Sequence, residues 1–201
     1  MNVKEVIMIE SILNELRISL IATGCLAIVL CGIYPAAVWL CAQGIFPDQA
    51  NGSLILVKGQ AVGSSLLAQP FTGPGYFHPR PSAAGSGYDA ANSGGSNLGP
   101  TSRKLIDRVK ERAAAYRNEN NLTSEIIIPV DAVTASASGL DPHISVKNAF
   151  IQASRIAKVR GMGEERSQKM ILSRTEGREL GIVGEPRVNV FLLNLDLDGK
   201  L

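Results

Sequence analysis

The feature that most constrains this chain is a long apolar run without charge. No Asp, Glu, Lys or Arg occurs between Ile18 and Pro47, where the sequence reads ISLIATGCLAIVLCGIYPAAVWLCA and beyond. A helix rises about 1.5 Å per residue and a hydrocarbon core is about 30 Å thick, so the run is long enough to cross a bilayer once. We therefore expect a polar lead at residues 1–17 and a transmembrane helix at residues 18–42.

The run is less consistent with a cleaved leader. A secretory signal peptide has an apolar region of about 7–15 residues followed by small residues, whereas this run is longer and ends in Trp39, Leu40 and Cys41. The segment before Cys25 is too short for the apolar region of a lipoprotein signal. An uncleaved anchor is the interpretation that fits the composition.

Basic residues predict the orientation of this anchor. Lys4 and Arg17 precede the apolar run, and the first basic residue after it is Lys58. The positive-inside rule then places the N-terminus in the cytoplasm and residues 48–201 on the outer side. The three cysteines all lie in the run, so the outer domain has no disulfide.

Residues 48–201 predict a compact α+β domain. Apolar residues recur at helical spacing in three segments and in short β-type runs in three others, without a repeated βαβ pattern. The expected elements are one or two strands with a tight turn at 51–71, a helix at 101–120, a buried strand at 125–133, helices at 144–161 and 164–173, and a final strand at 187–198.

Catalytic and ligand-binding signatures are scarce. The net charge is only +2, which does not favour nucleic-acid binding, and no G-x-x-x-x-G-K-[ST] phosphate loop occurs. The only two histidines, His78 and His143, lack partners at metal-ligand spacing. A membrane-tethered periplasmic hydrolase using Ser136, His143 and Asp141 remains the alternative to a non-catalytic protein.

The segment GYFHPRPSAAGSGYDAANSGGSNLG, residues 75–99, has neither helical nor strand periodicity. Glycine, serine and asparagine allow close backbone approach, and Tyr76, Phe77 and Tyr88 offer rigid contact area. Two interpretations stay open. The segment is either a surface that docks onto a partner or a loop that its own aromatic residues pack onto the domain.

Several blocks, in fixed order, resemble one family. They read NGSLI, GSSLLAQPFTGPGYFHPRPSA, SGGSNLGPTS, VTASASGLDPHIS, RIAKVRG and GEPRVNVFLLNLDLD. The chain is similar to the C subunit of the bacterial high-affinity potassium-transporting P-type ATPase, the Kdp complex. The resemblance covers the apolar run and nearly all of the outer domain, while the longer polar lead and the three cysteines depart from it.

The resemblance implies a non-catalytic accessory subunit that assembles and stabilises the complex. It would lie in the bacterial inner membrane, with its C-terminal domain in the periplasm over the outer mouth of a channel-like polytopic subunit. The other implied partners are a P-type motor subunit, a very small membrane subunit and membrane lipid. The complex uses ATP, magnesium and potassium, but this chain lacks the D-K-T-G-T sequence of the motor and would bind none of them directly.

The resemblance also suggests site residues. A second role proposed for such subunits is to assist nucleotide binding through a glutamine that corresponds to Gln69, although an outer domain cannot reach cytosolic ATP. We therefore favour assembly. The predicted partner interface consists of loop residues from the most recognisable blocks: Tyr76, Phe77, His78, Arg80, Ser93, Gly94, Gly95, Ser96, Asn97, Ser136, Ser138, Gly139 and Asp141.

Overall fold

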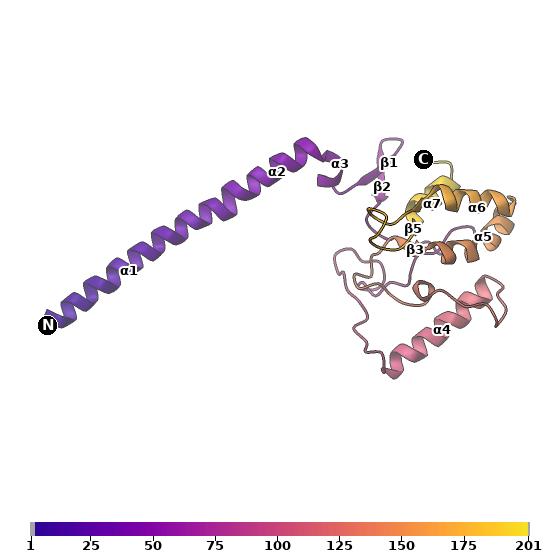
Figure 1. Ribbon diagram of the computed structural model, residues 1–201, viewed down its shortest axis with the longest axis horizontal. Helices are drawn as coiled ribbons and strands as arrows, with labels where there is room; N and C mark the ends of the chain where they lie inside the picture. The colour runs from indigo at the N-terminus through magenta and orange to yellow at the C-terminus, as the bar shows by residue number, and fades with distance from the viewer. Residues whose placement is uncertain (1–2, 201) are drawn as a thin grey trace. The chain divides into compact units, whose positions relative to one another are not determined.

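A computed structural model describes residues 3–200 and divides the chain into two compact units between Ser53 and Leu54. The first unit is a long helix composed of α1 (Val3–Ala27), η1 (Ile28–Ile33) and α2 (Tyr34–Ile45), followed by the short α3 (Pro47–Ala50) (Figure 1). The part from Met8 to Ile45 is long and apolar enough to cross a membrane. The helix expected at 18–42 is thus part of a longer one that begins in the polar lead.

The middle of this helix widens into a π-helical turn just before Pro35. Proline lacks an N–H and its ring collides with the preceding turn of an α-helix. The η1 segment spreads that turn, and the N–H of Tyr34 donates to the carbonyl of Val29, five residues earlier. The helix therefore continues through Pro35.

The second unit begins with the antiparallel hairpin of β1 (Leu54–Val57) and β2 (Gln60–Ser64). Its two turn residues, Lys58 and Gly59, both have positive φ, at 52° and 80°. Such a two-residue turn matches the twist of the flanking strands. The two strands and tight turn expected within residues 51–71 are confirmed.

The core of the second unit lies between a three-stranded sheet and three helices. The strands β3 (His143–Ser145), β5 (Arg187–Asn189) and β4 (Thr175–Glu176) are all antiparallel, in the order β3-β5-β4. Figure 1 shows α5 (Val146–Arg160), α6 (Glu164–Ser173) and α7 (Val190–Leu197) gathered beside this sheet. The mixed helices and small sheets confirm the α+β class.

Two of these helices, and α4 (Arg103–Glu119), confirm expectations from periodicity. Ala149, Ala153 and Ile156 on α5 are fully buried at helical spacing. Gly161 ends α5 with a φ of 64°, the left-handed conformation that glycine tolerates best. Periodicity was therefore informative for these three helices.

The segment 125–133 is not the buried strand that its apolar run suggests. It begins in a turn, in which the Ile126 N–H donates to the Thr123 carbonyl at 3.3 Å, and leads into the 3₁₀ turn η2 (Val130–Ala132) with no strand in between. The Ile126 carbonyl accepts from the Arg117 side chain at 3.0 Å instead of from a neighbouring strand. Ile127 and Val130 are 75% and 72% exposed. Part of the apolar run is therefore exposed, whereas Pro129 and Val133 are buried.

The segment 187–198 is only briefly a strand. The strand β5 ends at Asn189, whose side chain accepts a hydrogen bond from the Leu192 N–H at 3.2 Å and caps α7. From there Val190, Leu193 and Asn194 are buried at helical spacing. The alternating apolar residues suggested a strand. The cap that begins α7 depends on the tertiary fold, so the sequence pattern did not reveal it.

The loop before α4 is packed onto its own domain. Phe77 is fully buried and joins the core cluster with Ile144, Ile156 and Leu193. The expected contact of Phe77 with a partner is therefore wrong, because its ring is covered by residues of its own domain. The interpretation of residues 75–99 as a self-packed loop is confirmed at this position.

The C-terminal end of α7 is fixed to the same loop through Asp198. The Tyr76 hydroxyl and the Arg160 guanidinium donate to its carboxylate at 3.1 and 2.9 Å. Burial acts to raise the pKa of Asp198. Hydrogen bonds from Lys200, Arg160 and Tyr76 outweigh burial and hold that pKa below its ordinary value. The ionised carboxylate is therefore the form that stabilises this contact.

We predict that Phe77→Ala destabilises the domain by about 3–5 kcal/mol, because the change leaves a cavity in the core. Urea unfolding of the full chain in mild detergent, followed by circular dichroism, measures this. Leu66→Ala, at a side chain 59% exposed, is the control and should change the unfolding free energy by less than about 0.5 kcal/mol. Equal effects of the two changes would contradict the core position of Phe77.

We predict that Asp198→Asn lowers the unfolding free energy at pH 7 by about 1–3 kcal/mol, because it weakens hydrogen bonds to a charged group. The folded pKa is lowered, so the stabilisation is present above the unfolded pKa and is lost as the pH falls. The difference between the two proteins should shrink below about pH 4.

Thermal unfolding of both proteins across this pH range tests the prediction. Asp107→Asn is a suitable control, because the Asp107 carboxylate pairs with Arg103 at 3.2 Å on an exposed helix face. Such exposed pairs contribute little, so the control should be nearly neutral. A pH-independent difference for Asp198→Asn would show that charge is not the cause.

Candidate functional site

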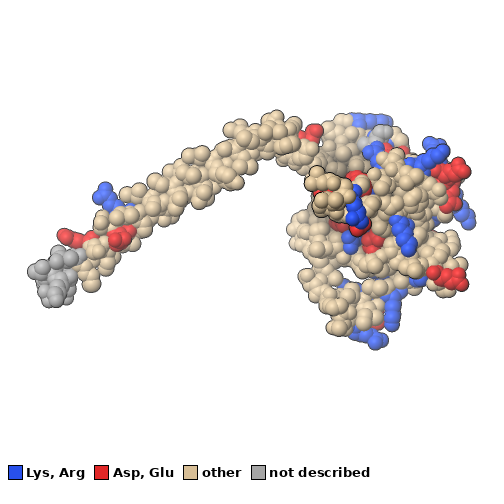
Figure 2. All heavy atoms as spheres, in the orientation of Figure 1, with Lys and Arg blue, Asp and Glu red and all other residues tan. Residues whose placement is uncertain are grey.

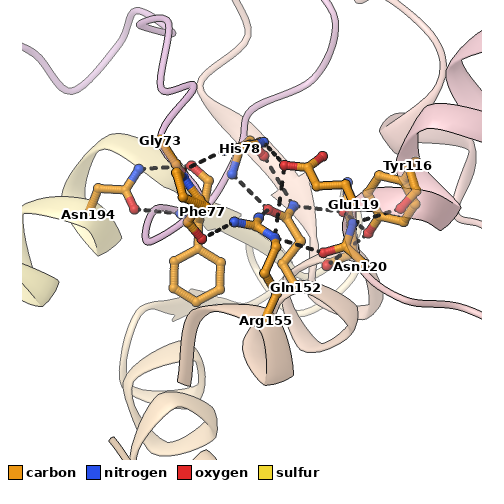
Figure 3. A network of polar contacts seen from close by, with 11 residues as sticks. Gly73, Phe77, His78, Tyr116, Glu119, Asn120, Gln152, Arg155 and Asn194 are labelled. Carbon is orange, nitrogen blue, oxygen red and sulfur yellow. Dashed lines mark hydrogen bonds and ion pairs between the residues drawn. The ribbon is translucent and has the colours of Figure 1, made fainter. Parts of the chain in front are cut away.

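Two buried side-chain amides hold the backbone of the loop at Phe77 and His78 (Figure 3). Asn194 of α7 accepts from the Phe77 N–H and donates to the Phe77 carbonyl, both at 2.9 Å. Gln152 of α5 accepts from the His78 N–H at 2.7 Å and donates to the His78 carbonyl at 3.2 Å. Each amide thus makes the two hydrogen bonds that a neighbouring strand would supply.

A buried arginine lies behind these amides. Arg155 of α5 donates to Asn120 and to Gln152, each at 3.0 Å, and also to the carbonyl of Pro74 (Figure 3). Burial lowers the pKa of Arg155, while the nearby Glu119 carboxylate acts to raise it. A buried guanidinium needs such partners because unpaired charge is costly to remove from water.

His78 lies between two acceptors in the same network. Its Nδ1 is 2.7 Å from the Glu119 carboxylate and its Nε2 is 2.9 Å from the Gly73 carbonyl (Figure 3). Only the protonated ring donates to both at once. The hydrogen bond from His78 lowers the pKa of Glu119 despite partial burial. Both ring nitrogens of His78 are therefore engaged within the domain.

Two glycine-rich and serine-rich loops meet on the outer surface of the unit. Gly94 N–H and the Ser93 hydroxyl donate to the Ser138 carbonyl at 2.8 and 3.0 Å. Ser82 donates to the carbonyl of Gly139 at 2.7 Å. Gly139 has a φ of 68°, and a Cβ there would lie 2.6 Å from the Ala84 nitrogen. Gly139 therefore permits the close approach of the two loops.

These loops line an open groove of about 700 Å³, which we call the docking groove. It gathers segments that are far apart in the sequence. Apolar lining comes from Leu66 and Leu67, which are 59% and 36% exposed. Polar lining includes Arg80, Ser93, Ser136, Ser138 and Asp141. The groove therefore combines exposed aliphatic area with hydroxyl groups and one ion pair.

The ion pair at the edge of the groove joins Arg80 to Asp141 at 2.9 Å. Burial acts to raise the pKa of Asp141, but hydrogen bonds from His143 and Arg80 outweigh it and lower that pKa. Asp141 also accepts from the backbone N–H of His143 at 3.0 Å. Arg80 is thereby fixed in place at the end of the loop that the two amides hold.

The geometry gives no support to the hydrolase alternative. The His143 Nδ1 is 3.3 Å from Asp141, and its Nε2 is 3.5 Å from Glu176. The Ser136 hydroxyl contacts Ser138 at 3.4 Å. Carboxylates thus face both nitrogens of His143, whereas a catalytic histidine directs one nitrogen to the nucleophilic hydroxyl.

The structure separates the predicted interface residues into three groups. Arg80, Ser93, Ser136, Ser138 and Asp141 line the docking groove, and Gly94, Gly95 and Gly139 form the backbone contact beneath it. Tyr76, Phe77 and His78 belong to the packing and the polar network of the loop. Ser96 and Asn97 are exposed next to these groups. Whether the groove contacts a partner stays a prediction.

Sequence reasoning missed Leu66 and Leu67 as members of the groove. They lie in a turn just beyond β2, where side chains do not follow the alternation of a strand, and both are exposed. Gln69 lies close by in the sequence, but its amide donates to the carbonyl of Val62 at 3.3 Å. It lines a different cavity, of about 740 Å³, together with Phe191 and Lys58.

Positive and negative side chains are intermixed on the visible face of the second unit (Figure 2). The long helix, in contrast, is free of charged residues along most of its length in the same view. Neither sign dominates the second unit, which agrees with the small net charge of the chain. Long-range attraction of ions or nucleic acid to such a surface is weak.

Comparison with known proteins identifies the family. The family model described as KdpC, K+-transporting ATPase, c chain, matches residues 16–199. The chain is 52% identical over 186 residues to a potassium-transporting ATPase KdpC subunit of Koribacter versatilis, covering 92% of this chain and 95% of the relative. It is 54% identical over 166 residues to one of Mycobacterium bovis, covering 83% and 88%. The chain belongs to the KdpC family.

Proposed function

We propose that the chain is a non-catalytic subunit of a potassium-transporting ATPase, anchored in the bacterial inner membrane by its apolar helix. Its relatives are named as KdpC subunits of such an ATPase. The absence of charge from Ile18 to Pro47 and the basic residues before that run support a membrane span with a cytoplasmic N-terminus. The second unit then lies on the periplasmic side.

The docking groove is the observation that carries the assembly role. It exposes two adjacent leucines among hydroxyl groups, and the backbone of its walls is fixed by hydrogen bonds. A preformed surface of this kind loses little conformational entropy on binding. We infer that its occupant is a loop of the channel-like subunit at the outer mouth of the ion pathway.

The nucleotide chemistry belongs to other subunits in this proposal. The Gln69 amide is engaged by the hairpin that precedes it, which supports a structural role for Gln69. ATP and magnesium act at the motor subunit, and potassium passes through the channel-like subunit. The very small membrane subunit completes the assembly. This chain contributes contacts that stabilise the complex and hold its subunits in position.

We predict that the double change Leu66→Gln and Leu67→Gln weakens assembly about tenfold or more, because polar amides replace aliphatic contact area in the groove. A tagged full chain, expressed with its native partners and extracted in mild detergent, reports assembly as the amount of co-purified subunits. Potassium uptake by potassium-starved cells should fall in parallel.

The matched control is Val159→Thr, because Val159 is 52% exposed on α5 and does not line the groove. It should leave assembly and uptake unchanged. The unfolding temperature of each variant is measured to separate misfolding from lost docking. Full assembly of a stably folded double variant would overturn the groove as the docking site.

A further inference from the structure

The loop between β4 and β5 carries an aliphatic tip that faces away from the domain. Leu180, Ile182 and Val183 are 93%, 76% and 54% exposed, and we call these three residues the apolar tip. Single exposed aliphatic residues are ordinary on protein surfaces, but a contiguous group of them marks a site of interaction. The apolar tip belongs to neither the docking groove nor the core.

The backbone of the apolar tip is well defined. Glu179 and Val183 exchange two backbone hydrogen bonds, both of 2.9 Å, so the residues between them form a tight turn. Leu180 and Gly181 have positive φ angles of 53° and 76°. Leucine adopts this left-handed conformation at a cost that glycine and asparagine largely avoid. The turn alone does not favour leucine at position 180.

Ion pairs connect the two sides of the loop below the tip. Arg178 pairs with Glu185 at 2.8 Å, and Arg187 pairs with Glu179 at 3.1 Å. Opposite charges therefore balance around the aliphatic residues. Lipid-binding loops and helices carry excess Lys or Arg and aromatic anchors for the headgroup region. Residues 177–186 have no aromatic residue and no excess basic charge, so they suit a protein cavity.

The base of this loop adjoins the docking groove. Glu185 and Arg187 line a second depression of about 470 Å³ together with Arg80 and Asp141. The same arginine and aspartate border the docking groove. The Arg80–Asp141 ion pair therefore lies between the docking groove and the base of the loop, as part of the lining of both depressions.

We infer that the apolar tip is a second docking element, which inserts into an apolar cavity on the channel-like subunit that occupies the groove. This inference rests on the proposed function. Burial of the tip removes aliphatic surface from water, and the balanced charges at its base remain at the rim of the contact. The leucine in a left-handed turn is explained by its contribution to this contact.

Leu180→Asn separates an effect on docking from an effect on folding, because we expect it to weaken docking without lowering the stability of the fold. Asparagine suits the left-handed backbone, so the unfolding temperature of the chain should stay equal or rise. Recovery of the other subunits on a tagged full chain should fall roughly tenfold when Ile182→Ser is added. Leu172→Gln is the control, since Leu172 is 60% exposed on α6 and should leave recovery unchanged.

Photo-crosslinking identifies what the apolar tip contacts. Ile182→Cys is introduced into a chain in which Cys25, Cys31 and Cys41 are replaced by alanine, and the thiol is labelled with benzophenone maleimide in native membranes. A cross-link to the polytopic subunit supports the inference. Cross-links to lipid alone, to a second copy of this chain or to no protein would overturn it.

The outcomes distinguish this inference from the proposed function. A wild-type chain that recovers no other subunit would refute the proposed function itself. A wild-type chain that recovers its partners, beside a double tip variant that recovers them equally, would refute only the role of the apolar tip. Lost recovery by the tip variants, with the Leu172→Gln control intact, supports both.

Discussion

The surface of this domain depends on two side-chain amides that replace a missing strand. The loop around Phe77 is rich in proline and glycine, so no helix or strand satisfies its backbone. Asn194 and Gln152, each 1% exposed, bind the N–H and the carbonyl of successive loop residues. An amide has a donor and an acceptor, which match the polar groups of a peptide. Without these bonds the loop could not carry Phe77 into the core.

The polar network and the docking groove are consequences of the same arrangement. Once Phe77 is buried, the chain leads through His78 to Arg80, which pairs with Asp141 at the edge of the groove. The buried Arg155 in turn needs the Pro74 carbonyl and Gln152 as acceptors. A loop carbonyl therefore accepts a hydrogen bond from a core side chain, and core amides in turn bind the backbone of the loop. Such mutual satisfaction makes the loop a rigid support instead of a mobile arm.

Sequence patterns predicted the elements whose burial follows a simple period. The helix α5 was predictable because Ala149, Ala153 and Ile156 repeat at helical spacing. The short α7 was not, because the cap at Asn189 forms only when β5 is in place. Among the site residues selected by loop composition and family resemblance, Arg80, Ser93 and Asp141 line one groove, while their contact with a partner stays a prediction. The burial of Phe77 was not predictable, since it depends on helices more than sixty residues away.

The two exposed apolar elements differ in how their positions are fixed, and this difference bears on the proposed assembly. Hydrogen bonds between loops hold the docking groove, as from Ser93 to Ser138, whereas ion pairs such as Arg178–Glu185 hold the base of the apolar tip. Salt screens exposed ion pairs more strongly than it weakens hydrogen bonds within a fold. When two rigid elements of one chain contact the same partner, the second contact forms at high effective concentration. In the proposed assembly, the groove would therefore determine where the partner binds, and the apolar tip would slow its release.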